Sequence, residues 1–331
     1  FGEASGWERA NWFLPKAAKN AGKKAEYDYS WRRQNWFEYS AAEHMAVRRK
    51  VGMFDMSSFG KIKLIGRDAE AVLQRIAAND VAVPVGKIVY TQFLNSEGHI
   101  EADVTITRLS ADEFLIVTPA ATIRRDLHWI NGHIPDSSHA IAVDITVSES
   151  VFVVMGPDAR SFLEPLIPQS LENKDFPFGT MQPIEIGHAI ARAHRVSYVG
   201  ELGWELYVSA DMSAHVFETI AARRKDHPLA MCGLHALDSC RIEKGFRHFG
   251  HDISNEDHVL EAGLGFAVKE NKQPGKFGPM IGADAVKAKR NDGLSQRLMQ
   301  FRLEDPDPLL YHNEAIYRDG VVIGYLTSGN Y

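Results

Sequence analysis

Two polar stretches, far apart in the chain, each hold a carboxylate on an apparent strand next to a glycine turn. The first covers residues 90–108 and contains Asp103, and the second covers residues 197–207 and contains Glu205. Successive side chains of a strand point to opposite faces, so each carboxylate lies opposite an apolar face. If the two stretches meet, the carboxylates would offer acceptors to a heterocycle rich in N–H donors and a base beside a reactive amine.

The alternation alone also fits a simpler interpretation of both residues. Asp103 shares its face with Glu101, Thr105 and Thr107, which is typical of a solvated outer surface. Glu205 shares its face with Tyr207 and would equally suit the exposed side of an edge strand. The residue pattern is therefore compatible with two interpretations of each carboxylate, a functional site and a solvent-exposed surface.

The surrounding sequence predicts helices and strands that interleave without a β-α-β rhythm, which favours an α+β fold with antiparallel sheets. Helices are predicted at 40–51, from 68 onward, and at 121–130, 159–166, 214–223 and 234–244. Strands are predicted at 59–65, 113–117, 141–147, 151–155, 184–195, 204–208, 298–303 and within 315–325.

Local signals predict where several elements begin and end. Ser40 and Glu43 have the spacing of a capping box, with the helix ending at Gly52. Asp68 is placed to cap the next helix, and Asn95 to Gly98 predict the turn of a hairpin. An Asp319-Gly320 pair predicts a second hairpin turn near the end of the chain.

The bulk composition is that of an ordinary globular protein and argues against two classes of partner. The 331 residues are 45% hydrophobic and 24% charged, enough for two or three domains. A net charge of −6 argues against a general nucleic-acid surface, and no apolar run suits a membrane span. The one basic run, residues 16–33 including Arg32, is interpreted as a connecting arm.

Motifs for other chemistries are weak or missing. Cys232 and Cys240 both fall near or within one predicted helix, which does not suggest a disulfide between them. They are interpreted as buried free thiols, and this fits a reducing compartment. His248 and His251 flank a glycine and lack a third ligand at a suitable spacing, so no metal site is predicted. The chain has no glycine-rich dinucleotide motif, so a flavin or nicotinamide site in this stretch is unsupported.

The sequence resembles the folate-binding aminomethyltransferase family, which includes the glycine-cleavage T-protein. The resemblance rests on residues 43–57, the two polar stretches, residues 232–241 and residues 260–265, in this order. The opening residues 1–13 are similar to the segment before the folate module of dimethylglycine and sarcosine dehydrogenases. Leu237 stands where the T-protein pattern has an arginine, which argues against glycine cleavage and for the dehydrogenase branch.

The resemblance implies a three-lobed, cloverleaf arrangement of mostly antiparallel sheets with flanking helices and a C-terminal β-rich lobe. Folate is expected in its central channel. The implied divisions are a connecting segment at 1–37, lobe one at 38–60 with 145–250, lobe two at 61–144, and an incomplete lobe at 275–331.

The resemblance also assigns roles to four residues. Asp103 matches the family's catalytic aspartate, near the nitrogen and carbon that react. Glu205 matches the residue that anchors the pterin ring, and Tyr198 and Tyr90 match tyrosines that pack on folate. For Tyr90, a core aromatic is an equally good interpretation.

The implied function is tetrahydrofolate-dependent capture of an iminium or formaldehyde unit from an N-methyl amine as 5,10-methylenetetrahydrofolate. FAD would belong only to an upstream domain, because Phe1 without a preceding Met predicts a fragment of a longer protein. The expected compartment is the cytoplasm, or the mitochondrial matrix in a eukaryote.

Two alternatives stay open. One is a tetrahydrofolate-dependent demethylase or methyltransferase that acts on a sulfonium or aryl ether. The other is a non-catalytic folate-binding assembly protein, whose Lys-Gly-Cys-aromatic-x-Gly-Gln-Glu signature is missing from the nearest run, residues 243–251.

Overall fold

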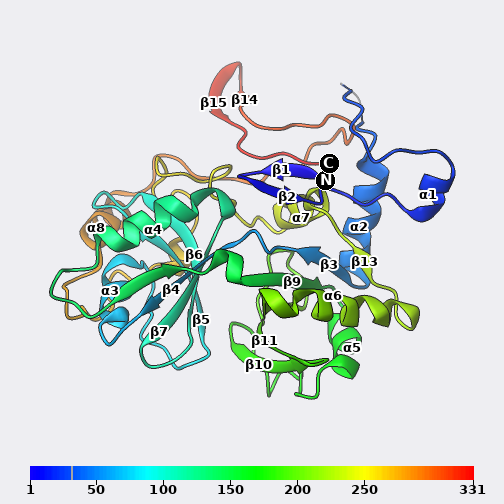
Figure 1. Cartoon of the computed structure of the whole chain (residues 1–331). Helices are drawn as coiled ribbons and strands as arrows, with labels where there is room; N and C mark the ends of the chain where they lie inside the picture. Colours follow the sequence, from blue (N-terminus) through cyan, green and yellow to red (C-terminus); the bar gives the residue numbers. More distant parts are fainter. Residues whose placement is uncertain (31–32) are drawn as a thin grey trace.

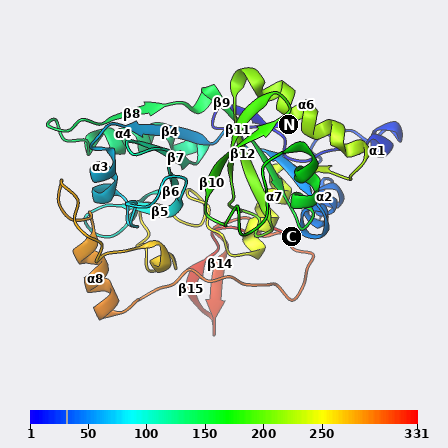
Figure 2. The same cartoon turned by 90° about the horizontal axis from the view of Figure 1, so that it is seen from below.

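Two β-sheets lie side by side and form the body of the molecule (Figures 1 and 2). The computed structural model describes residues 1–30 and 33–331. In spatial order the six-stranded sheet contains β10 (Met181–Ile186), β11 (Ala189–His194), β12 (Gly203–Ser209), β9 (Glu149–Met155), β3 (Gly52–Asp55) and β13 (Ala230–Met231). Its neighbouring strands are antiparallel except for β13 and β3, which run parallel.

The five-stranded sheet is antiparallel throughout. In spatial order it contains β5 (Ile88–Leu94), β6 (Ile100–Arg108), β7 (Glu113–Thr118), β4 (Gly60–Ile65) and β8 (Ile141–Asp144). The hairpin between β5 and β6 turns at Asn95–Gly98, as predicted. Gly98 has a φ of 82°, a conformation that glycine adopts without strain.

Helices cover the outer faces of both sheets because each sheet face and each helix has an apolar side to bury. Helices α3 (Ala69–Ile76) and α4 (Ile123–Gly132) pack on the five-stranded sheet, and α5 (Ala159–Leu163) and α6 (Ser213–Ala222) pack on the six-stranded sheet. Helices α2 (Phe37–Arg49) and α7 (Leu234–Glu243) pack against each other and beside β3.

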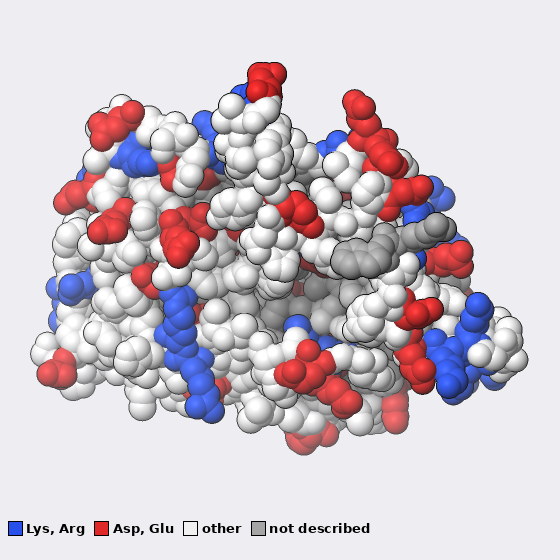
Figure 3. Space-filling model, turned by 90° about the horizontal axis from the view of Figure 1, so that it is seen from above, with Lys and Arg blue, Asp and Glu red and all other residues white. Residues whose placement is uncertain are grey.

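The remaining elements lie at the periphery (Figure 1). They are helices α1 (Lys16–Asn20) and α8 (Ala283–Asp292), the hairpin of β1 (Gly2–Ala4) and β2 (Trp7–Arg9), and the hairpin of β14 (Ala315–Arg318) and β15 (Val321–Tyr325). Short 3₁₀ turns occupy Ala120–Thr122, Thr146–Ser148, Glu164–Leu166, Ala210–Met212, Arg223–Lys225 and Gly265–Ala267. Seen from above, the molecule is hollowed near its centre, with acidic side chains at points along the rim (Figure 3).

This architecture confirms the predicted α+β class with mostly antiparallel sheets and flanking helices, and the predicted C-terminal β-rich lobe contains the small sheet of β14 and β15. The predicted boundaries between lobes stay a prediction. Within the described residues, no helix has the length and apolar character that crossing a bilayer requires.

The predicted capping box is wrong. Helix α2 begins at Phe37, so Ser40 and Glu43 both lie inside the helix and are buried. The Glu43 carboxylate instead accepts hydrogen bonds from the backbone N–H groups of Phe13, at 2.7 Å, and Gly233, at 2.8 Å. These two N–H groups belong to distant segments, so local spacing gave no sign of them.

Two further local predictions need correction. Asp68 precedes α3, but its carboxylate does not cap the helix and instead binds the His139 N–H and the Lys276 ammonium. Residues 298–303 form no strand, because within the described part of the chain no neighbouring segment pairs with them. Met299 and Phe301 are exposed there.

The N-terminal segment is docked on α7. The carbonyl groups of Ala10 and Asn11 accept hydrogen bonds from the Leu234 and His235 N–H groups at 3.0 and 3.1 Å. These N–H groups lie in the first turn of a helix, where no intrahelical partner exists. A Cβ at Gly233 would lie 2.2 Å from the Asn11 carbonyl, so only glycine allows this approach. Trp31 and Arg32, part of the predicted arm, lie outside the described residues.

We expect Glu43→Ala to lower the free energy of unfolding by about 2 kcal/mol, because the buried Gly233 N–H and the partly buried Phe13 N–H lose their acceptor. Urea unfolding measures the change. Glu38→Ala is the matched control, since Glu38 is exposed on the same helix. Equal stabilities for the two variants would contradict a fastening role for Glu43.

Candidate functional site

The register of the five-stranded sheet decides which way Asp103 points. Asp103 pairs with Gln92, and two residues further along β6, Thr105 pairs with Val117 of β7. Cross-strand partners share one face of a sheet, as do alternate residues of a strand. Val117 packs in an apolar cluster with Val153 of the other sheet. Asp103 therefore projects from the face of its sheet that meets the six-stranded sheet.

The same reasoning orients Glu205. It pairs with Val153, and Tyr207 pairs with Val151, so both side chains leave the face that meets the five-stranded sheet. Strand β12 lies between β11 and β9 and is not an edge strand. Glu205 is only 8% exposed. The surface interpretation of this carboxylate is therefore wrong, and the two candidate carboxylates lie on facing surfaces of the two sheets.

Three neighbours set the properties of Asp103. The Gln92 Nε2 group donates a hydrogen bond to its Oδ1 at 2.8 Å, and the Tyr90 hydroxyl lies near enough to lower its pKa. Burial raises the pKa of Asp103 to about 6, while these two groups and the Arg247 charge act in the opposite direction. The buried Gln92 Oε1 has no hydrogen-bond partner in the described part of the protein.

Tyr198 joins this group from the other polar stretch. Its hydroxyl donates a hydrogen bond to the Arg247 carbonyl at 2.8 Å, and its ring stacks on Phe246. Burial raises the pKa of both tyrosine hydroxyls, so Tyr90 and Tyr198 act as neutral donors at neutral pH. The structure thus brings Asp103, Tyr90 and Tyr198 together around Arg247.

Glu205 lies in a neighbouring group. The Tyr207 hydroxyl donates to its Oε2 at 2.9 Å, and burial raises the pKa of Glu205 to about 7. His194, its cross-strand partner, lies with its ring 4.3 Å from the Tyr207 ring. Among the described residues, no hydrogen bond or ion pair joins Glu205 to Asp103, and none reaches the Glu205 Oε1.

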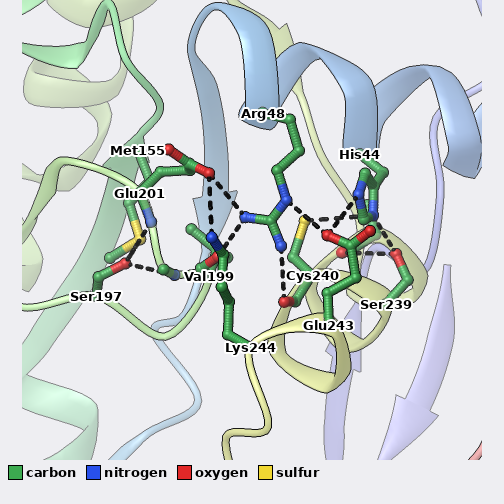
Figure 4. Close-up of polar contacts among 12 residues, drawn as sticks. His44, Arg48, Met155, Ser197, Val199, Glu201, Ser239, Cys240, Glu243 and Lys244 are labelled. Carbon is green, nitrogen blue, oxygen red and sulfur yellow. Dashed lines mark hydrogen bonds and ion pairs between the residues drawn. The ribbon is translucent and has the colours of Figure 1, made fainter. Parts of the chain in front are cut away.

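Arg48 holds the loop that carries Tyr198 (Figure 4). From α2, its Nη1 donates to the Val199 carbonyl and, at 3.1 Å, to the Glu201 carboxylate. Its Nη2 donates to the Cys240 carbonyl and its Nε to Glu243, both at 2.8 Å. One guanidinium therefore ties α2, α7 and the loop at residues 197–201 together.

Sequence reasoning missed four residues of this region: Gln92, Arg247, His194 and Arg48. The register of the predicted hairpin was a usable signal for Gln92, because it pairs directly with Asp103. The other three come together through tertiary contacts that no local pattern indicates. The described residues hold no group of three or more side chains suited to a metal ion, and His248 and His251 lie in a turn.

The fold is an α+β arrangement of two facing sheets, mostly antiparallel, and comparison with known proteins gives its family. The sequence matches the models described as the GCVT N-terminal domain, over residues 1–272, and the glycine cleavage T-protein C-terminal barrel domain, over residues 296–331. This chain therefore belongs to the glycine-cleavage T-protein family, whose relatives named below are enzymes. The predicted resemblance is confirmed.

Three relatives illustrate the range of the family. The 4-methylaminobutanoate oxidase (formaldehyde-forming) of Paenarthrobacter nicotinovorans is 41% identical over 331 residues, which cover 100% of this chain and 39% of the relative. The mitochondrial dimethylglycine dehydrogenase of Mus musculus is 35% identical, with 99% and 37% covered. An aminomethyltransferase of Halothermothrix orenii is 32% identical, with 87% and 78% covered. This chain thus spans well under half of the two oxidising relatives.

A solved structure supports the fold. The glycine cleavage system aminomethyltransferase T of Bartonella henselae superposes with a TM-score of 0.75 at 22% identity. The match covers 96% of this chain and 84% of that one.

Replacing Glu205 should change how stability depends on pH. The pKa of Glu205 is near 4.5 in the unfolded chain and about 7 in the folded protein, so the folded protein binds this proton more tightly. Its contribution to stability is therefore complete below about pH 4.5 and is lost as the pH rises through about 7. Relative to Glu205→Gln, the free energy of unfolding of the parent should fall by about 3 kcal/mol across this pH window, measured by urea unfolding. Parallel profiles of parent and variant would refute the burial argument, and exposed Glu185→Gln is the control.

Arg48→Lys should loosen the loop at residues 197–201, because one ammonium group cannot serve four acceptors held by two segments. Hydrogen exchange of the loop amides, followed by mass spectrometry, should become about tenfold faster. Arg49→Lys, at the exposed neighbouring position, should leave exchange unchanged. Unaltered protection in Arg48→Lys would show that the loop does not depend on the guanidinium.

Proposed function

We propose that this chain binds tetrahydrofolate and promotes the transfer of a one-carbon unit from an oxidised N-methyl amine to it. The observation that carries the proposal is the pair of carboxylates on facing sheet surfaces, the partly buried Asp103 and the buried Glu205. Each has a raised pKa, the buried Gln92 Oε1 beside Asp103 has no partner, and the Glu205 Oε1 receives no hydrogen bond from the described residues.

The residues fit the proposed cofactor. A buried carboxylate is stable only when hydrogen bonds or charges compensate its lost hydration. Glu205 receives one such bond, from Tyr207, and its Oε1 has none from the described residues. A ring with adjacent N–H donors, such as the aminopyrimidine of a pterin, would supply the missing bonds in paired form. The orphaned Gln92 Oε1 offers a further acceptor beside Asp103.

Asp103 is suited to proton transfer. With a pKa of about 6 it is mainly ionised at neutral pH yet can accept a proton, the balance that general-base catalysis requires. The amide of Gln92 holds the carboxylate by a hydrogen bond to its Oδ1. Its negative charge also favours a cation placed next to it. Tetrahydrofolate, when bound, supplies the nitrogens that take up the carbon.

The names of the relatives support an N-methyl amine as the carbon source. One is an oxidase of 4-methylaminobutanoate that forms formaldehyde, and another is a dehydrogenase of dimethylglycine. Those proteins are much longer than this chain. We therefore propose that the complete protein also has an upstream flavin domain, which oxidises the amine before this domain receives the carbon.

Two substitutions in the full-length protein separate the roles of the carboxylates. Asp103→Asn should keep tetrahydrofolate binding and slow carbon transfer by about 10²–10⁴-fold, because the base is lost. Glu205→Gln should weaken tetrahydrofolate binding by about tenfold or more, because a charged acceptor becomes partly a donor. Titration calorimetry and single-turnover transfer measure the two effects. Exposed Glu185→Gln should match the parent in both, and parent-like behaviour of both site variants would reject the proposal.

A further inference from the structure

Arg247 is a cation in the site without an anionic partner. It lies in the turn after α7, where its Nε donates to the Ala262 carbonyl at 3.0 Å and its Nη1 to the Gly245 carbonyl at 2.7 Å. These acceptors fix the plane of the guanidinium but, being neutral, form no ion pair with it. Within residues 1–30 and 33–331, no carboxylate forms an ion pair with it, and its Nη2 has no hydrogen bond.

Its position is central to the group described above. The Arg247 carbonyl accepts the Tyr198 hydroxyl, so the backbone of this residue is part of the site. The guanidinium also lies close enough to Asp103 and Tyr90 for its charge to lower the pKa of both. A ligand atom near the Asp103 carboxylate would therefore lie near this cation as well.

Two aromatic pairs involve the two site tyrosines and residues near Arg247 or Gly263 in the chain. The Tyr198 and Phe246 rings stack with centroids 6.1 Å apart, and so do the rings of Tyr90 and Phe266. Phe266 is 68% exposed, which is unusual for a side chain of this size in a cluster. The region of the site tyrosines thus combines the Arg247 cation with an exposed aromatic ring, that of Phe266.

Gly263 keeps the free edge of the guanidinium clear. Its φ is +71°, and a Cβ at this position would lie 2.6 Å from Nη2. Any larger residue would crowd the one nitrogen that has no partner.

We propose that Arg247 binds a carboxylate of the ligand that this site receives, with Phe246 and Phe266 packing on the ligand's apolar part. The planar fork of an arginine matches a carboxylate, and an unpaired cation gains most from such a partner where hydration is reduced. Leu237 stands where the T-protein pattern has an arginine, so Arg247 supplies a site cation from a different position. This inference rests on the proposed function, and the carboxylate belongs either to the glutamate end of folate or to the N-methyl amino acid.

Binding measurements on the full-length protein distinguish these sources. If Arg247 binds the glutamate, Arg247→Gln should weaken the binding of tetrahydrofolate by about tenfold. The binding of tetrahydropteroate, which lacks glutamate, should be unchanged. If the amino acid is bound, both folates should bind as in the parent. Sarcosine binding to the folate-saturated protein should then weaken about tenfold, while dimethylamine, without a carboxylate, is unaffected. Arg247→Lys, which keeps the charge but not the fork, should fall between parent and Arg247→Gln.

The control is Arg224→Gln, which removes an exposed arginine in the 3₁₀ turn after α6 and should match the parent. Equal weakening of tetrahydrofolate and tetrahydropteroate in Arg247→Gln would overturn the inference, because a structural defect does not discriminate between them. Unchanged binding of all four ligands would also overturn it. A parent protein that fails to bind tetrahydrofolate would instead reject the proposed function.

Discussion

The candidate site depends on the packing of two antiparallel sheets through one apolar cluster. Val117 of β7 and Val151 and Val153 of β9 are members of this cluster, together with residues of α2 and α7. Burial of these side chains sets which face of each sheet is turned inward, and the two-residue period of a strand then decides the direction of every other side chain. Glu205 points inward because it pairs with Val153, which belongs to this cluster. Asp103 points inward because Thr105, on the same face of its strand, pairs with Val117 of the cluster.

The same burial gives the carboxylates their chemistry. Removing a carboxylate from water disfavours its ionised form, which is the first cause of the raised pKa at Asp103 and at Glu205. Each receives fewer hydrogen bonds than full compensation of a buried charge would need. Incomplete compensation of this kind reduces the stability of the protein without ligand. It strengthens the binding of a ligand that provides the missing donors.

Long-range polar contacts then hold the inward-facing groups in place. Arg48 fastens the loop of Tyr198 to two helices, and Glu43 fastens the N-terminal segment to the start of α7. Both residues lie on α2, so this helix couples the segment that enters the domain to a loop of the site. Hydrogen bonds between these side chains and backbone carbonyl or N–H groups suit this role, since they do not depend on which side chain the backbone residue carries.

The sequence by itself determined the α+β class, the hairpin at Asn95–Gly98, the positions of most helices and strands, and the family. These follow from short-range periodicity, from turn residues and from motif order, which do not require knowledge of contacts. Only the tertiary structure decided that Glu205 lies in a central strand, that Glu43 serves distant N–H groups instead of capping its own helix, and that Arg247 lies beside Asp103. Each of these depends on which segments meet in space, and the contact is set by the packing of apolar faces over the whole chain, which local residue patterns do not encode.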